Sequence, residues 1–256
     1  MVKEHALIIG GTRGIGREVV DRFLENGFDI SVLSRRPPDT NSHQNVTYVQ
    51  SDISKPVKLL EVLKKIVREK GKIKALVFMQ RYRGDITSAW DGEIKVSLEG
   101  TRNVIEDLID SFCEEASIVV AISIASRFIA SEQPLSYHLG KAALEQLVRY
   151  YAVTLGPKGV RVNGVSFASV LKKESKHYYE ENPDLMNLYR TITPLRRMGS
   201  ASEIADGIAF LVSDSASFIN GHNLIIDGGI SLQWHESLAR ELGNFSKIDV
   251  TRDDDS

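Results

Sequence analysis

The chain has 256 residues, of which 42% are hydrophobic and 26% are charged, so it suits one large globular domain or two small ones. Its 32 basic and 34 acidic residues leave a net charge of -2, which gives no bulk reason to expect a nucleic acid or an anionic membrane as partner. Cys113 is the single cysteine, which excludes an internal disulfide and a cysteine-based metal cluster, and we expect no metal site. No apolar run approaches the roughly 18 residues of a membrane span, and the first residues lack the pattern of a signal peptide, so we expect a cytoplasmic protein.

Short apolar runs and amphipathic stretches alternate along the chain. The runs typical of buried strands lie at 5–11, 28–36, 46–53, 73–79, 117–124, 159–167 and 221–229. The stretches typical of helices lie at 14–27, 56–71, 100–116 and 201–214, and a further helix begins at Leu135. Continuous apolar strands that alternate with helices predict an α/β fold, a doubly wound parallel sheet of about seven strands with helices on both faces.

One segment, residues 171–198, interrupts this alternation. It is charged, rich in tyrosine and carries Pro183 and Pro194, so we expect an irregular insertion. The segment could close over a substrate as a lid, with Tyr178 facing the substrate, or it could form an oligomer contact. Nothing resembles a linker between domains. We therefore expect one domain over residues 1–232, followed by a polar tail at 233–256 that is frayed at its very end.

The segment GGTRGIG, residues 10–16, follows the first strand directly and opens the first helix. Glycines at 10, 14 and 16 let the backbone turn tightly and approach a pyrophosphate held at the helix N-terminus. The alternative is a tight turn that binds nothing. We assign the loop to a dinucleotide cofactor, with contacts from Gly10, Thr12, Arg13, Gly14, Ile15 and Gly16.

The end of the second strand indicates which dinucleotide binds. An NAD-specific site usually has an acidic residue there, which binds the adenosine ribose 2′-hydroxyl. This chain has Ser34 followed by Arg35 and Arg36, and a further arginine, Arg13, lies inside the glycine loop. Guanidinium groups at these places suit a 2′-phosphate, so the sequence predicts NADP(H). The alternative, solvated surface arginines, applies better to Arg36 than to the other two.

The segment SDI, residues 51–53, ends the third strand. We assign Asp52 and Ile53 in this segment to the adenine end of the cofactor. The alternative for Asp52 is to cap the helix that follows.

A tyrosine and a lysine lie one turn apart in the helix LSYHLGKAALEQL, residues 135–147. Tyr137 and Lys141, at positions i and i+4, share one face of this helix. An ammonium group near the phenol favours its phenolate form, so the two could work as a proton-donating pair. Taken alone, the spacing is more often an ordinary half-buried tyrosine beside a solvated lysine. His138, the residue after the tyrosine, is expected on the helix surface.

Taken together and in order, these motifs resemble the short-chain dehydrogenase/reductase family over nearly the whole chain. The resemblance rests on GGTRGIG, SDI, the first serine of AISIAS, YHLGK, VRVNGV and the ending PLRRMGSASEIADGIAFLVSDSASFINGHNLIIDGG. Within the family, the pattern is similar to the acyl-carrier-protein ketoreductase branch, seen in many NADPH-dependent carbonyl reductases. The resemblance implies a Rossmann fold and a homodimer or homotetramer built on the helices that contain Gly100 and Tyr137.

The resemblance also implies roles for individual residues. Tyr137 would be the general acid that protonates the carbonyl oxygen as hydride arrives from the nicotinamide, or the base in the reverse direction. Lys141 would hold the nicotinamide ribose hydroxyls and promote ionisation of the tyrosine. Ser123 would hydrogen-bond the substrate oxygen, and its place at the end of the fifth strand agrees, because such sheets bind ligands beyond the carboxyl ends of their strands. On these grounds the tyrosine–lysine pair is interpreted as catalytic.

The chain departs from the family pattern at identifiable positions. The usual Asn-Asn-Ala-Gly after the fourth strand is replaced by FMQR, residues 78–81. The helix asparagine that usually helps to hold a proton-relay water behind the lysine is replaced by Ser97, a shorter group that can still bind water and that we include among the catalytic residues. Smaller departures are Phe167-Ala168 in place of Pro-Gly, Ile9 in place of threonine, and one extra residue between Ser123 and Tyr137.

These observations predict an NADP(H)-dependent oxidoreductase that transfers a hydride between nicotinamide and a small-molecule carbonyl or secondary alcohol. Two alternatives remain open: a catalytically inactive NADP(H)-binding sensor or scaffold, and an epimerase or dehydratase of the same family that uses the cofactor transiently. Net consumption of NADPH separates the first hypothesis from the other two. Arg81 and Arg83, after the fourth strand, would face an anionic group of the substrate, such as a carboxylate or phosphate, or else cover the cofactor or point to solvent.

Overall fold

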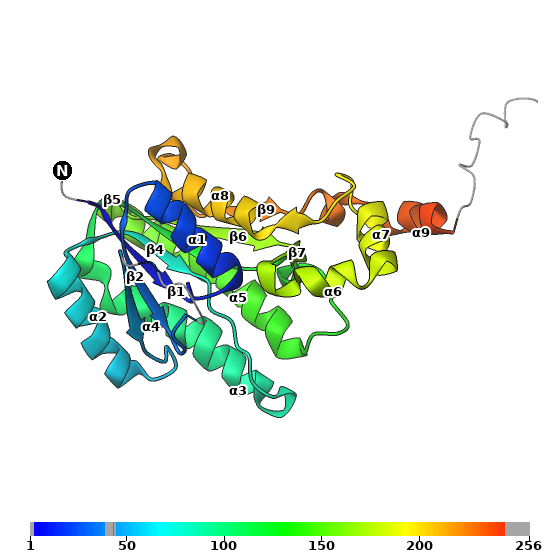
Figure 1. Ribbon diagram of the computed structural model, residues 1–256. Coiled ribbons are helices and arrows are strands. Elements are labelled where there is room, and N and C mark those ends of the chain that lie inside the picture. Colours follow the sequence, from blue (N-terminus) through cyan, green and yellow to red (C-terminus); the bar gives the residue numbers. More distant parts are fainter. Residues whose placement is uncertain (1–2, 39–42, 44, 244–256) are drawn as a thin grey trace, which may run out of the picture.

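The computed structural model describes residues 3–38, 43 and 45–243. Seven parallel strands form one sheet in the order β3-β2-β1-β4-β5-β6-β9 (Figure 1). In chain order they are β1 (His5–Ile9), β2 (Asp29–Ser34), β3 (Val46–Gln50), β4 (Ile73–Phe78), β5 (Phe112–Ala121), β6 (Arg161–Phe167) and β9 (Asn223–Ile226). The direction of the strand order reverses between β1 and β4, which is where open parallel sheets bind their ligands. The predicted single-domain, doubly wound α/β fold is confirmed.

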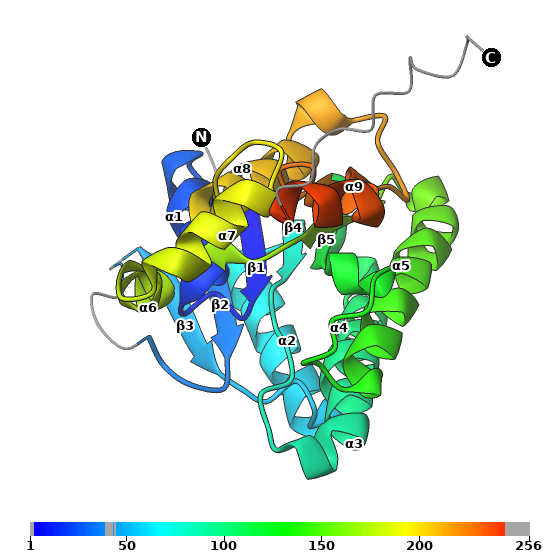
Figure 2. The same ribbon diagram turned by 90° about the vertical axis from the view of Figure 1, so that its right-hand side faces the viewer.

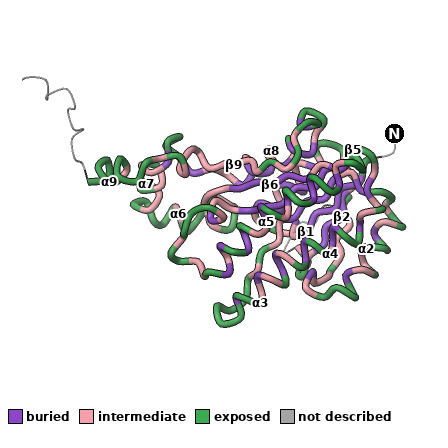
Figure 3. The backbone as a smooth tube through the Cα atoms, turned by 180° about the vertical axis from the view of Figure 1, so that it is seen from behind, coloured by how far each residue is buried: buried purple, intermediate pink, exposed green. Residues whose placement is uncertain are grey.

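Helices cover both faces of this sheet (Figures 1 and 2). One face is covered by α2 (Pro56–Lys70), α4 (Gly100–Asp107) and α5 (Leu135–Leu155), and the other by α1 (Gly14–Glu25) and α8 (Ala201–Val212). Within β1, Leu7 and Ile9 belong to the first of these cores, whereas Ala6 and Ile8 belong to the second. Successive side chains of a strand point to opposite faces, so a strand covered on both faces is apolar at every position. Figure 3 shows the central strands as the buried part of the molecule.

Helix α4 is shorter than the sequence predicts. The pattern predicts a helix over 100–116, whereas α4 ends at Asp107 and β5 begins at Phe112. Phe112 is buried and pairs with Ile73 of β4, so packing of its ring outweighs the helical propensity of the residues around it. The pairing of β4 with β5 then shifts register, and Glu115 adopts a positive φ of 58°. Such an irregularity leaves no trace in the hydrophobic pattern.

A π-helical stretch precedes α4 and packs against α5. Helix α3 (Ala89–Glu93) continues directly into this stretch (Ile94–Glu99), and both pack against α5. π-Helical turns are rare and often mark functional sites, because the wider turn shifts the side chains that follow. Ser97 lies in the middle of this stretch and is buried.

The segment 171–198 is helical, not irregular as the sequence predicts. Two short strands, β7 (Val170–Leu171) and β8 (Gly199–Ser200), pair at its ends, and α6 (Lys176–Glu180) and α7 (Pro183–Ile192) lie between them. Pro183 occupies the first turn of α7, where its missing N–H has no intrahelical partner to lose, so the proline starts a helix. The tail contains α9 (His235–Leu242), which lies with α6 and α7 at one end of the molecule (Figures 1 and 2). The predicted fraying at the chain end falls outside the described residues.

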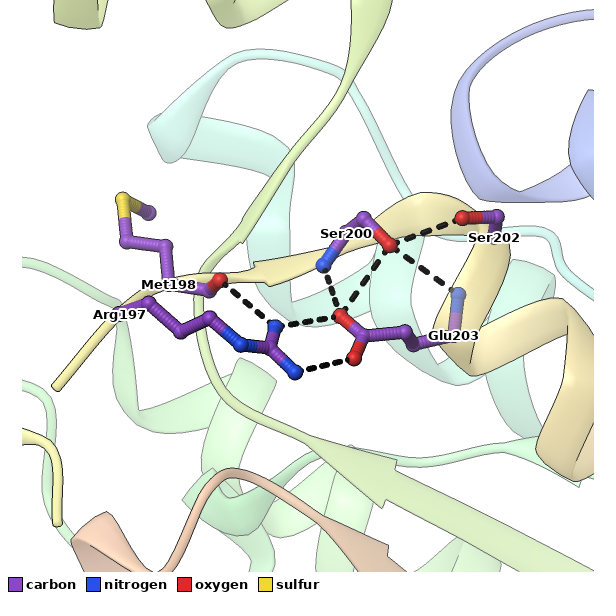
Figure 4. A network of polar contacts seen from close by, with 5 residues as sticks. All are labelled: Arg197, Met198, Ser200, Ser202 and Glu203. Atoms are coloured by element: carbon purple, nitrogen blue, oxygen red, sulfur yellow. Dashed lines mark hydrogen bonds and ion pairs between the residues drawn. The ribbon is translucent and has the colours of Figure 1, made fainter. Parts of the chain in front are cut away.

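An ion-pair network ties the end of this segment to α8 (Figure 4). Arg197 contacts both carboxylate oxygens of Glu203, with Nη2 at 2.6 Å from Oε1 and Nη1 at 2.9 Å from Oε2. Ser200 caps the helix: its Oγ accepts a hydrogen bond from the Glu203 N–H, and its own N–H donates to the Glu203 carboxylate. The Arg197 contact, aided by Ser200, lowers the pKa of Glu203 to about 2, so the link is charged throughout the neutral range.

Candidate active site

A cavity of about 380 Å³ opens at the carboxyl-terminal edge of the sheet. Its walls come from the loops after β1 and β4, the ends of β2, β5 and β6, and the first two turns of α5. Asp52, Ser97, Ser123 and Tyr178 are described but do not line it. The cavity brings together the other residues assigned from the sequence: Gly10, Thr12, Arg13, Gly14, Ile15, Gly16, Ser34, Arg35, Ile53, Arg81, Arg83, Tyr137 and Lys141.

The glycine loop forms one wall of the cavity, and its geometry leaves no room for larger residues. Gly10 has a φ of 90°, and a Cβ added to Gly16 would lie 2.2 Å from the Gly10 carbonyl oxygen. The N–H of Gly14, at the start of α1, donates to Glu174 Oε1 at 2.8 Å. A carboxylate oxygen thus contacts an amide of the kind that holds phosphate oxygens at helix N-termini.

Exposed arginines, Arg13, Arg35 and Arg36, line the nucleotide end of the cavity. Arg13 comes from the glycine loop, and Arg35 follows Ser34 at the end of β2. Ser34 Oγ donates to the backbone carbonyl of Arg36 at 2.6 Å, and this hydrogen bond shapes the turn that carries Arg35 and Arg36. An NAD-specific site has an acidic side chain at the end of β2, which binds a ribose hydroxyl. Here that position is Ser34, whose hydroxyl group bonds its own turn and has guanidinium groups beside it.

Asp52 is used to shape the turn before α2. Its Oδ1 accepts hydrogen bonds from the N–H of Ser54 at 3.0 Å and from Ser54 Oγ at 2.7 Å. Burial raises the pKa of Asp52, but the Ser54 hydrogen bonds and the charge of Arg35 outweigh it and hold the pKa below its usual value. The neighbours Ser51 and Ile53 line the cavity, so Asp52 shapes the turn that carries them.

Tyr137 and Lys141 lie at the opposite end of the cavity. Lys141 Nζ is 5.6 Å from the centroid of the Tyr137 ring. The lysine is 4% exposed, and Nζ donates to the carbonyl of Ala121 at the end of β5 at 3.3 Å. Burial lowers the pKa of Lys141 to about 8, while the Glu93 carboxylate opposes this shift and Arg81 adds to it. At neutral pH the site therefore presents an ammonium group beside a phenol.

Ser123 begins a 3-10 turn (Ile124–Ser126) directly after the cavity wall formed by Ala121 and Ile122. Its Oγ accepts a hydrogen bond from the Ala125 N–H at 3.2 Å. That contact uses a lone pair and leaves the hydroxyl proton able to donate.

Ser97 lies behind the cavity, where it contacts a carboxylate that the sequence analysis missed. Its Oγ donates to Glu93 Oε2 at 2.5 Å, and the two side chains are 1% and 4% exposed. Glu93 stands four residues before Ser97, so the two share a helix face. In the sequence, the unusual Ser97 with a glutamate one helical turn before it was the signal that could have indicated this contact.

Cationic side chains line the cavity from Tyr137 to the glycine loop, where Lys172 Cδ would lie 3.6 Å from a Cβ added to Gly14. Arg81 lies over the Tyr137 ring, with Cζ 5.8 Å from the ring centroid. Partial burial, then the charges of Arg81 and Arg13, lower the pKa of Arg83. Burial and the charges of Arg83 and Arg81 lower the pKa of Lys172 in the same way. Like charges held this close favour the binding of an anion between them.

The departure FMQR after β4 has two different consequences. Phe78 is fully buried in the core, whereas Met79, Gln80 and Arg81 line the cavity. Gln80 Nε2 donates to Thr101 Oγ1 at 2.9 Å, and its buried Oε1 has no partner among the described residues. The loop therefore offers an unused hydrogen-bond acceptor at the cavity.

The segment 171–198 reaches the cavity through residues other than the predicted one. Lys172 lines the cavity, and Glu174 contacts the glycine loop. Tyr178 is 56% exposed and packs edge to face with Tyr179 at 5.3 Å between ring centroids. Tyr178 therefore does not line the cavity, a placement that the tyrosine-rich composition does not specify.

His138 is buried, not on the helix surface as expected. Its Nε2 accepts a hydrogen bond from the Ala130 N–H at 2.9 Å, and its Nδ1 lies 3.1 Å from the Pro134 carbonyl. These contacts require a neutral ring with the proton on Nδ1. The histidine thus fixes the loop that leads into Tyr137.

The residues present fit a phosphate-rich dinucleotide. The glycine loop approaches closely, Gly14 already donates to an anionic oxygen, and Gln80 Oε1 can accept from a hydroxyl group. The cations that line the cavity are Arg13, Arg35, Arg36, Arg81, Arg83, Lys141 and Lys172, and no carboxylate from the described part of the chain lines it. Within that same part, no three His, Cys, Asp or Glu side chains are placed to hold a metal ion, and no helix has the length and hydropathy to cross a bilayer.

The parallel sheet, the glycine loop and the cavity at the strand ends define a dinucleotide-binding protein of the Rossmann class. A family model described as Enoyl-(Acyl carrier protein) reductase matches residues 10–231. The chain belongs to the short-chain dehydrogenase/reductase family, as its motifs predict. Members of this family are oxidoreductases that use nicotinamide cofactors and are usually oligomeric.

Individual relatives and solved structures agree with this assignment. Isoepoxydon dehydrogenase of Penicillium expansum is 29% identical over 244 residues, which cover 88% of this chain and 94% of that protein. Peroxisomal 2,4-dienoyl-CoA reductase of Rattus norvegicus is 25% identical over 242 residues, or 88% of this chain and 82% of that protein. The aldohexose dehydrogenase of Thermoplasma acidophilum superposes with a TM-score of 0.79 at 26% identity, covering 91% of this chain and 95% of the other. The chain is therefore a dehydrogenase or reductase.

Proposed function

We propose that this protein is an NADP(H)-dependent oxidoreductase that interconverts a carbonyl and a secondary alcohol, with Tyr137 as general acid and base. The observation that carries the proposal is that Tyr137 and Lys141 line the same cavity as the glycine loop. The bound nicotinamide supplies or accepts the hydride. The protein's own part is then to bind both molecules, to exclude water and to move one proton.

The proton is moved at the phenolic oxygen of Tyr137. In the reducing direction this O–H protonates the carbonyl oxygen, and in the oxidising direction the phenolate takes the proton from the alcohol. The buried ammonium of Lys141, with Nζ 5.6 Å from the tyrosine ring centroid, stabilises the phenolate that forms. The hydroxyl proton of Ser123 donates to the same substrate oxygen.

The preference for NADP(H) over NAD(H) is supported by the charges at the nucleotide end. Arg13 and Arg35 line that end, and the residue at the end of β2 is Ser34, not an acid. Guanidinium groups can hold a 2′-phosphate with several charge-assisted hydrogen bonds. An unmodified 2′-hydroxyl offers them no such contact.

An anionic substrate is supported by the charges at the catalytic end. Arg81 stands over the Tyr137 ring, its charge helps to lower the pKa of the partly buried Arg83, and the charges of Arg83 and Arg81 help to lower the pKa of Lys172. A carboxylate or phosphate on the substrate would relieve this repulsion while its carbonyl faces Tyr137. Substitution of Arg81 by Ala should raise KM for a keto acid more than KM for a neutral ketone.

The experiment that tests the function follows NADPH oxidation at the nicotinamide absorbance. The panel contains ketones, 3-oxo thioesters, keto acids and keto sugars, together with a dienoyl thioester and an aldose because two related proteins carry the names dienoyl-CoA reductase and aldohexose dehydrogenase. Tyr137→Phe should keep NADPH binding and lose at least about 100-fold in kcat. Tyr48→Phe, a tyrosine of β3 that does not line the cavity, is the control.

Three outcomes would contradict the proposal. An active Tyr137→Phe variant would remove the tyrosine from the mechanism. Tight NADPH binding by the wild type without turnover of any compound would favour the cofactor-sensing alternative. Conversion of a substrate without net consumption of NADPH would favour an epimerase or dehydratase.

We also propose a homo-oligomer built on α5. The exposed face of this helix carries Leu139, Tyr150 and Val153, which are 46%, 61% and 75% exposed. Apolar side chains aligned on one helix face are typical of subunit contacts. Light scattering on Tyr150→Glu/Val153→Glu should give a smaller mass than the wild type, and an unchanged mass would exclude this face.

A further inference from the structure

A buried carboxylate packs against the helix that carries Lys141. Glu93, at the end of α3, is 4% exposed. A Cβ added to Gly140, the residue before Lys141, would lie 3.6 Å from Glu93 Oε2, so the carboxylate packs against the catalytic helix itself. Burying a carboxylate is costly unless it has partners, so its place here needs an explanation.

Its hydrogen-bond partner is Ser97 of the π-helical stretch, and further hydrogen bonds link Ser97 to the altered loop after β4. Ser97 Oγ donates to Glu93 Oε2 at 2.5 Å. The carbonyl of Ser97 accepts from Thr101 Oγ1 at 2.6 Å, and that hydroxyl accepts from Gln80 Nε2 at 2.9 Å. The network therefore connects Gln80 and Ser97, two positions at which the chain departs from its family's pattern, to Glu93.

The charges around Lys141 explain what a carboxylate does here. The groups that face the lysine are Tyr137 on its own helix, Arg81 from the loop after β4, Glu93 from α3 and the uncharged Ala121 carbonyl. Burial and Arg81 both favour the neutral amine, and Glu93 is the one charge in this group that favours the ammonium. A single backbone carbonyl at 3.3 Å compensates little of the cost of burying that charge.

We propose that Glu93 is a positioning residue that keeps Lys141 protonated and aimed at Tyr137, and that Ser97 and Gln80 serve this reaction by holding Glu93 in place. The consequence for catalysis rests on the proposed function, but the effect on Lys141 does not. In this protein a carboxylate, fixed by a serine, sits behind the lysine where family members with an asparagine hold a water.

The direct test is a titration of Lys141 in the full chain without cofactor. Carbon-13 at the lysine Cε positions reports protonation of each amine by NMR, and Lys141→Met identifies the resonance. Glu93→Gln should lower the pKa of Lys141 by about 1 unit, because it removes the nearby opposite charge. Glu99→Gln, an exposed glutamate of the same π-helical stretch, should leave the titration unchanged.

Two further variants keep the test decisive. Glu93→Asp retains the charge and should give a smaller shift than Glu93→Gln. Ser97→Ala removes the hydroxyl that holds the carboxylate, so it should shift Lys141 in the same direction by less, and it serves in place of Glu93→Gln if that variant does not fold. A Lys141 titration that is the same in wild type, Glu93→Gln and Ser97→Ala would overturn the proposal.

Kinetics then test the catalytic consequence separately. In Glu93→Gln the alkaline limb of the kcat profile should move to lower pH by the same amount as the Lys141 titration, with KM for the carbonyl little changed. A merely structural defect would lower kcat at every pH alike. A protein that turns over no carbonyl would sink the proposed function and still leave the NMR titration to decide the role of Glu93.

Discussion

The two ends of the cavity are built in different ways. At the nucleotide end, seven consecutive residues form the glycine loop, and exposed arginines stand on the loop and at the tip of β2. At the catalytic end, Tyr137 and Lys141 depend on side chains from α3 and the loop after β4 and on a backbone carbonyl at the end of β5. The nucleotide end thus depends on backbone geometry and on solvent-exposed charges, whereas the catalytic end depends on buried charges. The first should therefore be sensitive to side-chain volume, and the second to protonation.

The largest effect should come from adding a methyl group to the backbone end. In Gly16→Ala the new Cβ would meet the Gly10 carbonyl oxygen at 2.2 Å, and a backbone atom cannot move aside as a flexible side chain would. If the loop moves to make room for the methyl group, we expect NADPH affinity to fall by about 1,000-fold. If the loop keeps its conformation, we expect the unfolding free energy to fall by about 3 kcal/mol. Calorimetric titration and chemical denaturation measure the two quantities.

Gly156→Ala is the matched control for this substitution. Gly156 has an ordinary helical φ of -51°, and its added Cβ would approach only Asn220 Nδ2, at 3.6 Å. Its stability should change by less than about 0.5 kcal/mol. If Gly16→Ala bound NADPH as tightly as Gly156→Ala, the close approach of the loop would not be a requirement of the site.

The buried end should reveal itself as a dependence of stability on pH. Lys141 has a pKa of about 8 in the folded protein and an ordinary value of 10.5, so between these pH values the folded state binds fewer protons than the unfolded chain. Raising the pH across this window therefore favours folding, by about 3 kcal/mol in total. Chemical denaturation at pH 7 to 10.5 should show this gain relative to Glu93→Gln/Lys141→Met, a reference that leaves no buried charge unpaired. Parallel stability curves for the two proteins would mean that Lys141 is solvated.

The same division explains what could be predicted from the sequence. The glycine loop with Arg13, the run Ser34-Arg35-Arg36, and the pair Tyr137 and Lys141 each lie within a short stretch, so their spacing alone predicts that the members of each share a loop or a helix face. The strand pattern then predicts that the ends of successive strands meet at one edge, which joins these pieces into one site.

Residues that act through tertiary contacts were missed. Glu93 follows a tryptophan and an aspartate in a polar stretch and has the pattern of a solvated helix acid, and only the packing of α3 on α5 buries it. Lys172 lines the cavity and Glu174 contacts the glycine loop because β7 pairs with β8, an interaction of two residues per strand that no periodicity can predict. Phe112 similarly starts β5 early because of a core contact, not a local preference.

The nucleotide end can be tested by charge as well as by volume. Arg13→Ser/Arg35→Ser should weaken NADPH binding by about 100-fold and change NADH binding little, because on the proposed function the lost guanidinium groups would contact only the 2′-phosphate. Arg190→Ser, on the exposed side of α7, should leave both affinities unchanged. Equal losses for NADPH and NADH would assign these arginines to the pyrophosphate that both cofactors share.

The smallest expected effect concerns the residue that links the two ends. Glu174 donates nothing to the loop but accepts from the Gly14 N–H at 2.8 Å, and its charge partly offsets those of Arg83 and Lys172. A pyrophosphate must displace this carboxylate from the amide, so Glu174→Gln should tighten NADPH binding by about 3- to 10-fold at low salt, and by less at high salt. Glu180→Gln, which loses only an exposed ion pair with Lys176 on α6, should change nothing. Weaker binding by Glu174→Gln would show instead that the carboxylate helps the cofactor to bind, because it orders the cations around it. Glu174 would then assist the pyrophosphate and not compete with it for the Gly14 N–H.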